Sequence, residues 1–171
     1  TVETSPTDYW NDSCARDEME YAIANGAVGA TTNPVIVQTV LSLEAETWKP
    51  TIDTLIIENP RATEEDIAWK LICSIVQERS KLLLPVFEKS GGKQGRIAIQ
   101  VNAKHYRDPE FMAEQAVYFQ SLAPNIVVKI PATTAGIEAM KLATAEGVSV
   151  LATVCFTVSQ SIAIAESIEE G

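Results

Sequence analysis

Hydrophobic residues follow a helical period in some segments and form short apolar runs in others, and the two kinds of segment alternate along the chain. The first expected helix has apolar residues at i, i+3 and i+4 spacing, namely Met19, Ala22 and Ile23. Asp12 and Ser13 can cap this helix, and Gly26 is placed to end it. The sequence therefore predicts a helix before residue 26.

The middle of the chain continues with a strand and further helices. A short strand is expected over residues 27–31, and Pro34 fits the first turn of the next helix because its missing N–H is not needed there. Residues 43–59 are less regular and indicate a broken helix. A longer helix begins after Thr63, with acidic residues in its first turn, and ends before the turn-forming residues 90–95. This stretch is an extra helical segment around residues 43–95.

The second half repeats the same alternation. Strands are expected over residues 96–102, 126–131 and 148–156, with helices at residues 109–122, 134–146 and from about Ser159. Strands that alternate with helices form parallel βα units with right-handed crossovers. No GxGxxG or Walker-type loop follows a strand, which argues against a nucleotide-binding sheet.

The fold class that fits is α/β, a TIM (β/α)8 barrel. Eight βα units usually take about 250 residues, and the 171 residues of this chain supply about five. We therefore expect a single but incomplete barrel domain over residues 1–171, which covers the first five units. The chain is expected to be a piece of a longer protein.

Composition excludes several classes of partner. Lys and Arg total 13 against 23 Asp and Glu, so the net charge is −10 and the pI is near 4.6. No basic stripe is present, so neither nucleic acid nor an anionic membrane surface is an expected partner. No apolar run approaches the ~18 residues of a spanning helix. Three widely spaced cysteines without a CxxC pair fit a reducing cytoplasm and predict no metal site.

Counting the strand that Asp12 finishes, five strands are expected, and polar residues interrupt or finish each of them. They are Asp12, Thr31 to Asn33, Gln100 with Asn102, Lys129, and Thr153. In a (β/α)8 barrel the reactive groups gather at the C-terminal ends of the strands. These side chains are therefore the candidate site.

Lys129 stands out because it lies inside the apolar stretch NIVVKIPATTAG. Burial of a charge is costly unless it is paired or neutralised, so this lysine either snorkels to solvent or has a chemical role. A partly dehydrated lysine keeps a share of free amine that attacks a carbonyl and forms an imine. The protonated imine is an electron sink that permits cleavage of a nearby carbon–carbon bond when a carboxylate takes up the proton.

The other candidates have roles in the same chemistry. Asp12 is the candidate acid/base, Asn33 and Thr153 can bind substrate hydroxyls or a catalytic water, and Gln100 can position water without a charge. Each also has a structural interpretation. Lys129 can be a surface or salt-bridged lysine, Asp12 a helix cap, Asn33 a turn residue and Thr153 a strand residue. The single histidine, His105, is interpreted as solvated and not catalytic.

Two motifs resemble the transaldolase family. The stretch GATTNPVIV is similar to the family's second-strand motif, and VVKIPATTAGIEAMKLATAEGV resembles its Schiff-base lysine strand and following helix. The segment LATVCFTVSQSIAIAE is similar to the fifth strand and helix. The resemblance covers nearly the whole chain, with the motifs in the family's order.

The resemblance implies a TIM barrel that moves a dihydroxyacetone unit between sugar phosphates in the pentose phosphate pathway. It implies that Lys129 forms the Schiff base, Asp12 is the acid/base and Thr153 positions water, and that Asn33, together with Thr32, binds the dihydroxyacetone unit. Gln100 remains the second candidate for positioning water. It implies no cofactor and no metal. The family often assembles, so a homo-oligomer is an expectation.

Two positions depart from the transaldolase pattern and leave alternatives open. Gln100 stands where those enzymes have a glutamate and Leu151 where they have an asparagine, as in the fructose-6-phosphate aldolase branch, which releases dihydroxyacetone. The phosphate-binding stretch of the family's sixth strand has no counterpart after Ser159, so the chain alone is expected to be inactive. A third alternative is a non-catalytic, barrel-derived binding protein.

Overall fold

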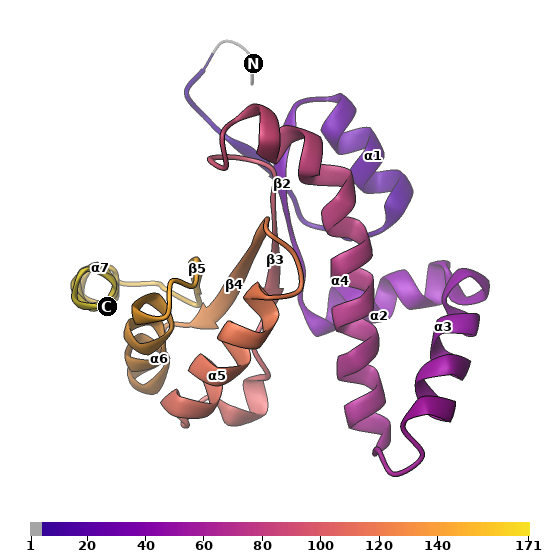
Figure 1. The fold of residues 1–171 in the computed structure, drawn as a ribbon. Helices are drawn as coiled ribbons and strands as arrows, with labels where there is room; N and C mark the ends of the chain where they lie inside the picture. The colour runs from indigo at the N-terminus through magenta and orange to yellow at the C-terminus, as the bar shows by residue number, and fades with distance from the viewer. Residues whose placement is uncertain (1–4) are drawn as a thin grey trace. The chain divides into compact units, whose positions relative to one another are not determined.

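The computed structural model describes residues 5–171, which divide into two compact units, one that ends at Ile97 and one over Ala98–Gly171. The first unit holds β1 (Tyr9–Asn11), α1 (Arg16–Ala24), β2 (Ala27–Thr31), α2 (Pro34–Leu43), α3 (Ala45–Glu58) and α4 (Glu64–Lys89). The second holds η2 (Ala103–His105), α5 (Pro109–Gln120), β4 (Ile126–Pro131), α6 (Thr134–Ala145), β5 (Val150–Thr153) and α7 (Val158–Glu170). The strand β3 (Arg96–Gln100) begins in the first unit and ends in the second (Figure 1).

The strands follow one another across the sheet in chain order, β1-β2-β3-β4-β5. The pairings of β1 with β2 and of β4 with β5 are parallel, and at least one helix separates each strand from the next. Sequential parallel strands with helical crossovers are the pattern of the first five units of a (β/α)8 barrel. The fold class predicted from the sequence is confirmed.

The first unit is organised around β1 and β2. Trp10 of β1 pairs with Gly29 of β2, and the indole of Trp10 covers that glycine. A Cβ at residue 29 would lie 2.5 Å from two ring carbons of Trp10, so only glycine fits there. Helix α1 begins at Arg16 with Ala15 in the N-cap position and no side-chain cap. The expectation that Asp12 and Ser13 cap this helix is therefore wrong.

Helix α4 contributes more buried apolar residues to the first unit than any other single element. Thr63 and Asp66 form a capping box at its start, and the helix ends at Lys89, both as expected. Its buried apolar residues are Leu71, Cys73, Ile75, Val76 and Leu83. The expected broken helix over residues 43–59 is instead the continuous helix α3, which accommodates Pro50 in its second turn.

A buried arginine joins several elements of the first unit. Arg79 is 1% exposed, and its Nε donates to the carbonyl of Cys14 at 2.8 Å. Its guanidinium also pairs with Glu44 and Glu78 and lies over the ring of Trp48. Because Cys14 belongs to the loop after β1, this network holds the segment that follows Asp12.

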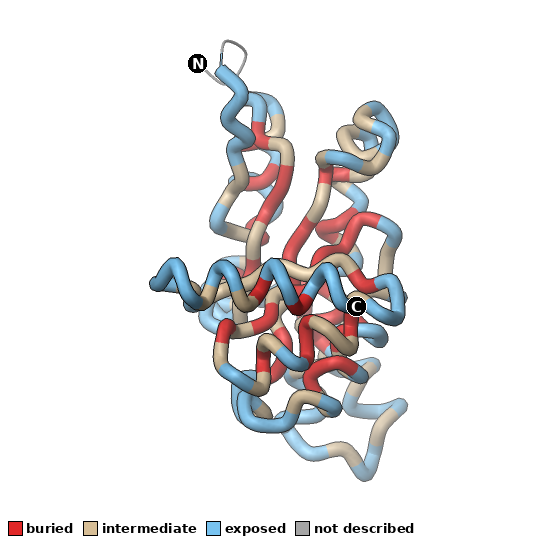
Figure 2. The backbone as a smooth tube through the Cα atoms, turned by 90° about the vertical axis from the view of Figure 1, so that its left-hand side faces the viewer, coloured by how far each residue is buried: buried red, intermediate tan, exposed pale blue. Residues whose placement is uncertain are grey.

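The second unit has the same pattern of strands flanked by helices. Most of its buried apolar residues come from β4, α5 and α6, including Ile126, Val128, Ile130, Met112, Ala116, Phe119, Ala139, Met140 and Ala143. In both units the buried positions gather on the strands and on one side of the helices, whereas α7 is mostly exposed (Figure 2). None of the helices within residues 5–171 is both long and apolar enough to span a bilayer.

Candidate functional site

Lys129 lies in β4 among buried residues but is itself half-buried. Its neighbours Val128 and Ile130 have no exposed surface. Because successive side chains point to opposite faces of a strand, Lys129 shares a face with Val127 and Pro131 and not with those two neighbours. The lysine therefore belongs to the face of the sheet that Pro131 also occupies.

Gln100 lies beside Lys129 in the sheet. The N–H of Val101 donates to the carbonyl oxygen of Lys129 at 3.1 Å. In a parallel ladder this bond places Gln100 next to Lys129 and Val101 next to Ile130. On the other side of β4, Lys129 pairs with Leu151 of β5. The lysine thus has an amide on one side and an apolar side chain on the other.

Thr153 ends β5 on the same face. It lies two residues after Leu151, so the two side chains share a face. The strand end is fixed by the N–H of Ala132, which donates to the carbonyl of Thr153 at 2.8 Å. The structure therefore brings Gln100, Lys129 and Thr153 together on neighbouring strands of the second unit.

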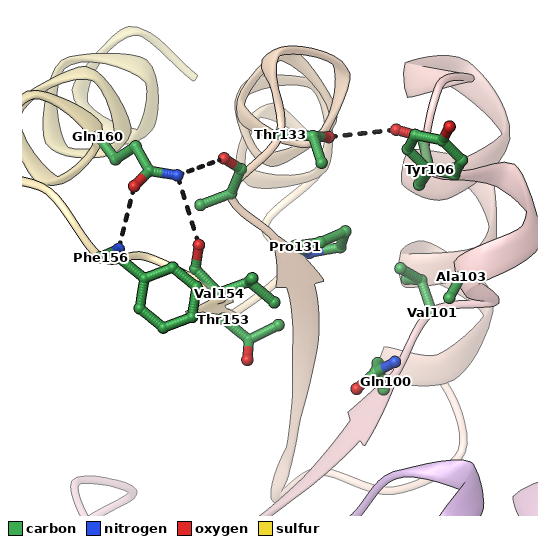
Figure 3. A pocket seen from close by; sticks show the side chains of 11 residues that line it. Gln100, Val101, Ala103, Tyr106, Pro131, Thr133, Thr153, Val154, Phe156 and Gln160 are labelled. Atoms are coloured by element: carbon green, nitrogen blue, oxygen red, sulfur yellow. Dashed lines mark hydrogen bonds between the residues drawn. The ribbon is translucent and has the colours of Figure 1, made fainter.

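A pocket of about 510 Å³ opens at the C-terminal ends of these strands. Its lining includes Gln100, Tyr106, Pro131, Thr133, Thr153 and Phe156, which Figure 3 shows around the strand ends. Lys129 lies two residues before Pro131 in β4 and is not among the lining residues. The walls combine aromatic and aliphatic carbon with a few hydroxyl and amide groups, as small-molecule sites do.

The turn after β4 is held closely against its surroundings. The hydroxyl of Thr133 donates to the carbonyl of Tyr106 at 3.1 Å (Figure 3). It also accepts from the N–H of Gly136 at 2.9 Å. A Cβ at residue 136 would lie 1.8 Å from the carbonyl oxygen of Pro131, so only glycine lets α6 start this close to the strand. The rim of the pocket is a tight, hydrogen-bonded turn.

Two features of the pocket were not expected from the sequence. Val154 has a φ of 57°, a left-handed backbone that β-branched residues rarely adopt. Gln160 of α7 reaches across to the loops after β4 and β5 with its side-chain amide (Figure 3). The spacing of Thr157 and Gln160 indicates a capping box, but no sequence pattern shows that the amide nitrogen also binds distant carbonyl groups.

Asp12 lies in the first unit, directly after β1, and is exposed. The side-chain amide of Asn11 donates to the carbonyl of Ser13 at 3.1 Å, so the backbone on both sides of Asp12 is held in a turn. The carboxylate is at the C-terminal end of a strand, which is where the sequence predicts it. Since α1 begins at Arg16, this carboxylate does not act as the cap of α1.

Thr32 and Asn33 follow β2 in the first unit. Thr32 is 1% exposed, so its hydroxyl is part of the interior. The side-chain oxygen of Asn33 accepts from the N–H of Ile36 at 2.9 Å and caps α2. The cap uses the acceptor oxygen of this amide and not its donor nitrogen.

His105 packs against an aromatic side chain. Its ring stacks on Phe111 with 3.8 Å between the ring centroids, and the residue is half-buried. It is less solvated than expected from the sequence, and the stacking accounts for its position. The predicted site residues thus lie in both units, with Asp12, Thr32 and Asn33 in the first and Gln100, Lys129 and Thr153 in the second.

Comparison with known proteins gives one consistent result. Residues 9–170 match the family model described as Transaldolase/Fructose-6-phosphate aldolase. The chain is 32% identical over 160 residues to proteins named Transaldolase from Mycobacterium bovis and Mycobacterium ulcerans, which covers 88% of this chain and 42% of each relative. It is 30% identical over 171 residues to a Transaldolase from Mycolicibacterium smegmatis, covering 95% of this chain and 45% of that protein.

Proposed function

Because the chain belongs to the transaldolase/fructose-6-phosphate aldolase family, we propose that its protein transfers a dihydroxyacetone unit between sugar phosphates through a Schiff base on Lys129. The pathway would be the pentose phosphate pathway and the compartment the cytoplasm. The chain spans 42 to 45% of the length of the relatives that it matches, so the proposal concerns the whole protein.

The proposed chemistry begins with attack of the Lys129 amine on the ketone carbon of a ketose phosphate. Loss of water gives a protonated imine, which withdraws electrons from the neighbouring carbons. The bond between the α carbon and the hydroxyl-bearing carbon then breaks. Its electron pair moves into the imine to give an enamine, the hydroxyl proton goes to a base, and an aldose phosphate leaves. In transfer, the enamine carbon attacks the aldehyde of a second aldose, and hydrolysis frees Lys129.

The remaining residues have the roles that the resemblance assigns. Asp12 accepts the hydroxyl proton and returns it to the acceptor. Thr32 and Asn33 bind the dihydroxyacetone unit, and the amide nitrogen of Asn33 is the group available after α2 is capped. Gln100 and Thr153 hold the catalytic water that hydrolyses the imine.

One observation carries the proposal beyond the family match. Lys129 is half-buried and lies beside Gln100 in the ladder, next to a pocket of about 510 Å³ whose lining includes Gln100 and Thr153. A lysine on a purely solvated or purely apolar face would lack such neighbours. These surroundings support the proposal that the Lys129 amine reacts with a small polar substrate.

A second candidate function is cleavage that releases dihydroxyacetone, as a fructose-6-phosphate aldolase would do. Two positions favour it: an uncharged amide, Gln100, lies on one side of Lys129, and Leu151 lies on the other. Neither a carboxylate nor an asparagine is present at these two positions. The groups that hold water near the imine intermediate therefore differ from those that the transaldolase pattern has. The two reactions share the imine and differ in the fate of the three-carbon unit.

Product analysis of the intact protein tests the proposal. Fructose 6-phosphate is supplied with and without erythrose 4-phosphate, and free dihydroxyacetone and seven-carbon ketose phosphate are measured. Transferase activity gives the seven-carbon product and little free dihydroxyacetone. Release without an acceptor supports the aldolase, and no consumption of substrate under either condition supports the non-catalytic alternative. The same comparison on the 171-residue chain checks our expectation that it is inactive alone.

A further inference from the structure

We propose that Gln160 is a positioning residue whose side-chain NH2 group locks the loops after β4 and β5, and so fixes Thr153 relative to Lys129. This inference rests on the proposed function, because it assigns a purpose to the placement of those two residues. The side chain lies over the end of the pocket and bridges the two loops (Figure 3).

The amide of Gln160 makes contacts of two kinds. Its oxygen accepts from the N–H groups of Phe156 at 3.0 Å and Thr157 at 3.2 Å, and from the hydroxyl of Thr157 at 3.1 Å. Its nitrogen donates to the carbonyl oxygens of Ala132 at 3.0 Å and Val154 at 3.4 Å. The reverse orientation of the amide would set N–H against N–H and oxygen against oxygen, so these neighbours define which atom lies where.

Only the oxygen is needed for capping. A capping box requires an acceptor in the third position of the helix, and glutamate is as suitable as glutamine. The chain's other described capping box uses a carboxylate, Asp66, which accepts from the N–H of Thr63 at 2.9 Å. The NH2 group of Gln160 is therefore additional to capping, and its bonds lead to the ends of the two strands.

Those bonds hold a strained turn. Val154 has a left-handed backbone, which is unfavourable for a β-branched residue and persists only where the surroundings impose it. Val154 directly follows Thr153, and Ala132 is three residues after Lys129. By holding Ala132 and Val154, the amide keeps the bond from the N–H of Ala132 to the carbonyl of Thr153 closed at 2.8 Å.

Lys129 itself lies within the β4 ladder, whereas Thr153 is the last residue of β5. Loss of the amide donor should therefore displace the hydroxyl of Thr153 more than the amine of Lys129. Steps that need a positioned water should slow, whereas formation of the imine should persist. The expected kinetic signature is a lower kcat with a smaller change in KM.

Two variants separate this role from capping. Gln160→Glu keeps the acceptor and the capping box but replaces the NH2 donor by a carboxylate that faces two carbonyl oxygens. Thr157→Ala removes the N-cap hydroxyl, which accepts from the backbone N–H of Gln160 at 3.2 Å and donates to its side-chain oxygen at 3.1 Å, and leaves the two bonds from the NH2 group to the carbonyl oxygens in place. The first variant tests the donor, and the second is the matched control for a weakened helix cap.

The experiment measures hydrogen exchange at the Ala132 amide and kcat as a function of pH, on the intact protein. We expect exchange at Ala132 to accelerate about tenfold in Gln160→Glu, the scale of one lost hydrogen bond, and to stay near wild type in Thr157→Ala. We expect the kcat of Gln160→Glu to recover toward wild type as pH falls and the new carboxyl gains a proton that it can donate.

The outcomes for the two proposals are distinct. If Gln160→Glu keeps wild-type exchange at Ala132 and wild-type kcat at every pH, Gln160 is only a cap and the inference is overturned. If wild-type protein forms no imine, the proposed function fails. The exchange at Ala132 still decides whether Gln160 holds the loops, since it needs no activity.

Discussion

Gln100 of β3 lies directly beside Lys129 of β4, because the N–H of Val101 donates to the carbonyl of Lys129. An uncharged amide is thus the nearest polar neighbour of the proposed nucleophile across that ladder. We propose that its hydrogen bonds position water without adding a second charge.

Gln100→Glu should shift the protein toward transfer. A carboxylate accepts two hydrogen bonds from the water and holds it more firmly, so the enamine survives until an acceptor aldehyde arrives. The ratio of seven-carbon ketose phosphate to free dihydroxyacetone should rise. Gln38→Glu, on the exposed side of α2, adds the same charge far along the chain and should leave the ratio unchanged. If the product ratio of Gln100→Glu equals that of the wild type, residue 100 does not control the reaction by positioning water.

Asp12→Ala should leave imine formation intact and slow bond cleavage. The expected loss in kcat is about 10²–10⁴-fold, the range of a general acid–base group. Single-turnover kinetics with borohydride quenching separate the two steps. Asp17→Ala, an exposed carboxylate in the first turn of α1, is the control. Full activity in Asp12→Ala would show that another group transfers the proton.

Arg79→Met should destabilise the first unit. The variant leaves Glu44 without its buried partner and removes the bond to the carbonyl of Cys14, which together should lower the free energy of unfolding by about 3–5 kcal/mol. Lys49→Met breaks an exposed pair with Asp53 and should cost less than about 1 kcal/mol. Urea unfolding of both variants gives the comparison. Equal losses would mean that the Arg79 network contributes no more than a surface pair.

Glu44 should make the free energy of unfolding depend on pH below about 4.5. Burial raises the pKa of its carboxyl, but bonds from the Arg16 N–H and the Trp48 indole and the charge of Arg79 outweigh this, so the pKa lies below 4.5. A depressed pKa stabilises the folded state above the ordinary value of 4.5, and this stabilisation is lost as pH falls below it. Glu44→Gln should flatten the decline in urea midpoint over that range. The exposed Glu46→Gln should retain it.

The sequence predicted an element correctly where its boundaries depend on residues that are neighbours in the chain. The strand over residues 27–31, the start of α2 at Pro34 and the start of α4 after Thr63 are all as expected, because each depends on neighbouring residues. The first helix begins later than predicted, at Arg16. Its start is set by distant groups, since Glu44 accepts from the N–H of Arg16 at 2.9 Å.

The same distinction applies to the candidate site. Lys129 could be singled out because a charge within an apolar strand is conspicuous in the sequence. Gln160 could not, because its nitrogen binds the carbonyl of Ala132, 28 residues away, and backbone oxygens carry no sequence signal. The left-handed Val154 was missed for a related reason: valine is an unusual residue for that conformation, which its surroundings impose.

Borohydride trapping tests the central claim most directly. The intact protein is incubated with fructose 6-phosphate, reduced with borohydride, digested and mapped by mass spectrometry, with Lys129→Met in parallel. We predict one stable adduct, on the peptide that contains Lys129, and none in the variant. The exposed lysines Lys93 and Lys104 serve as internal controls and should stay unmodified. An adduct on another lysine, or unchanged mass in the wild-type protein, would contradict the account.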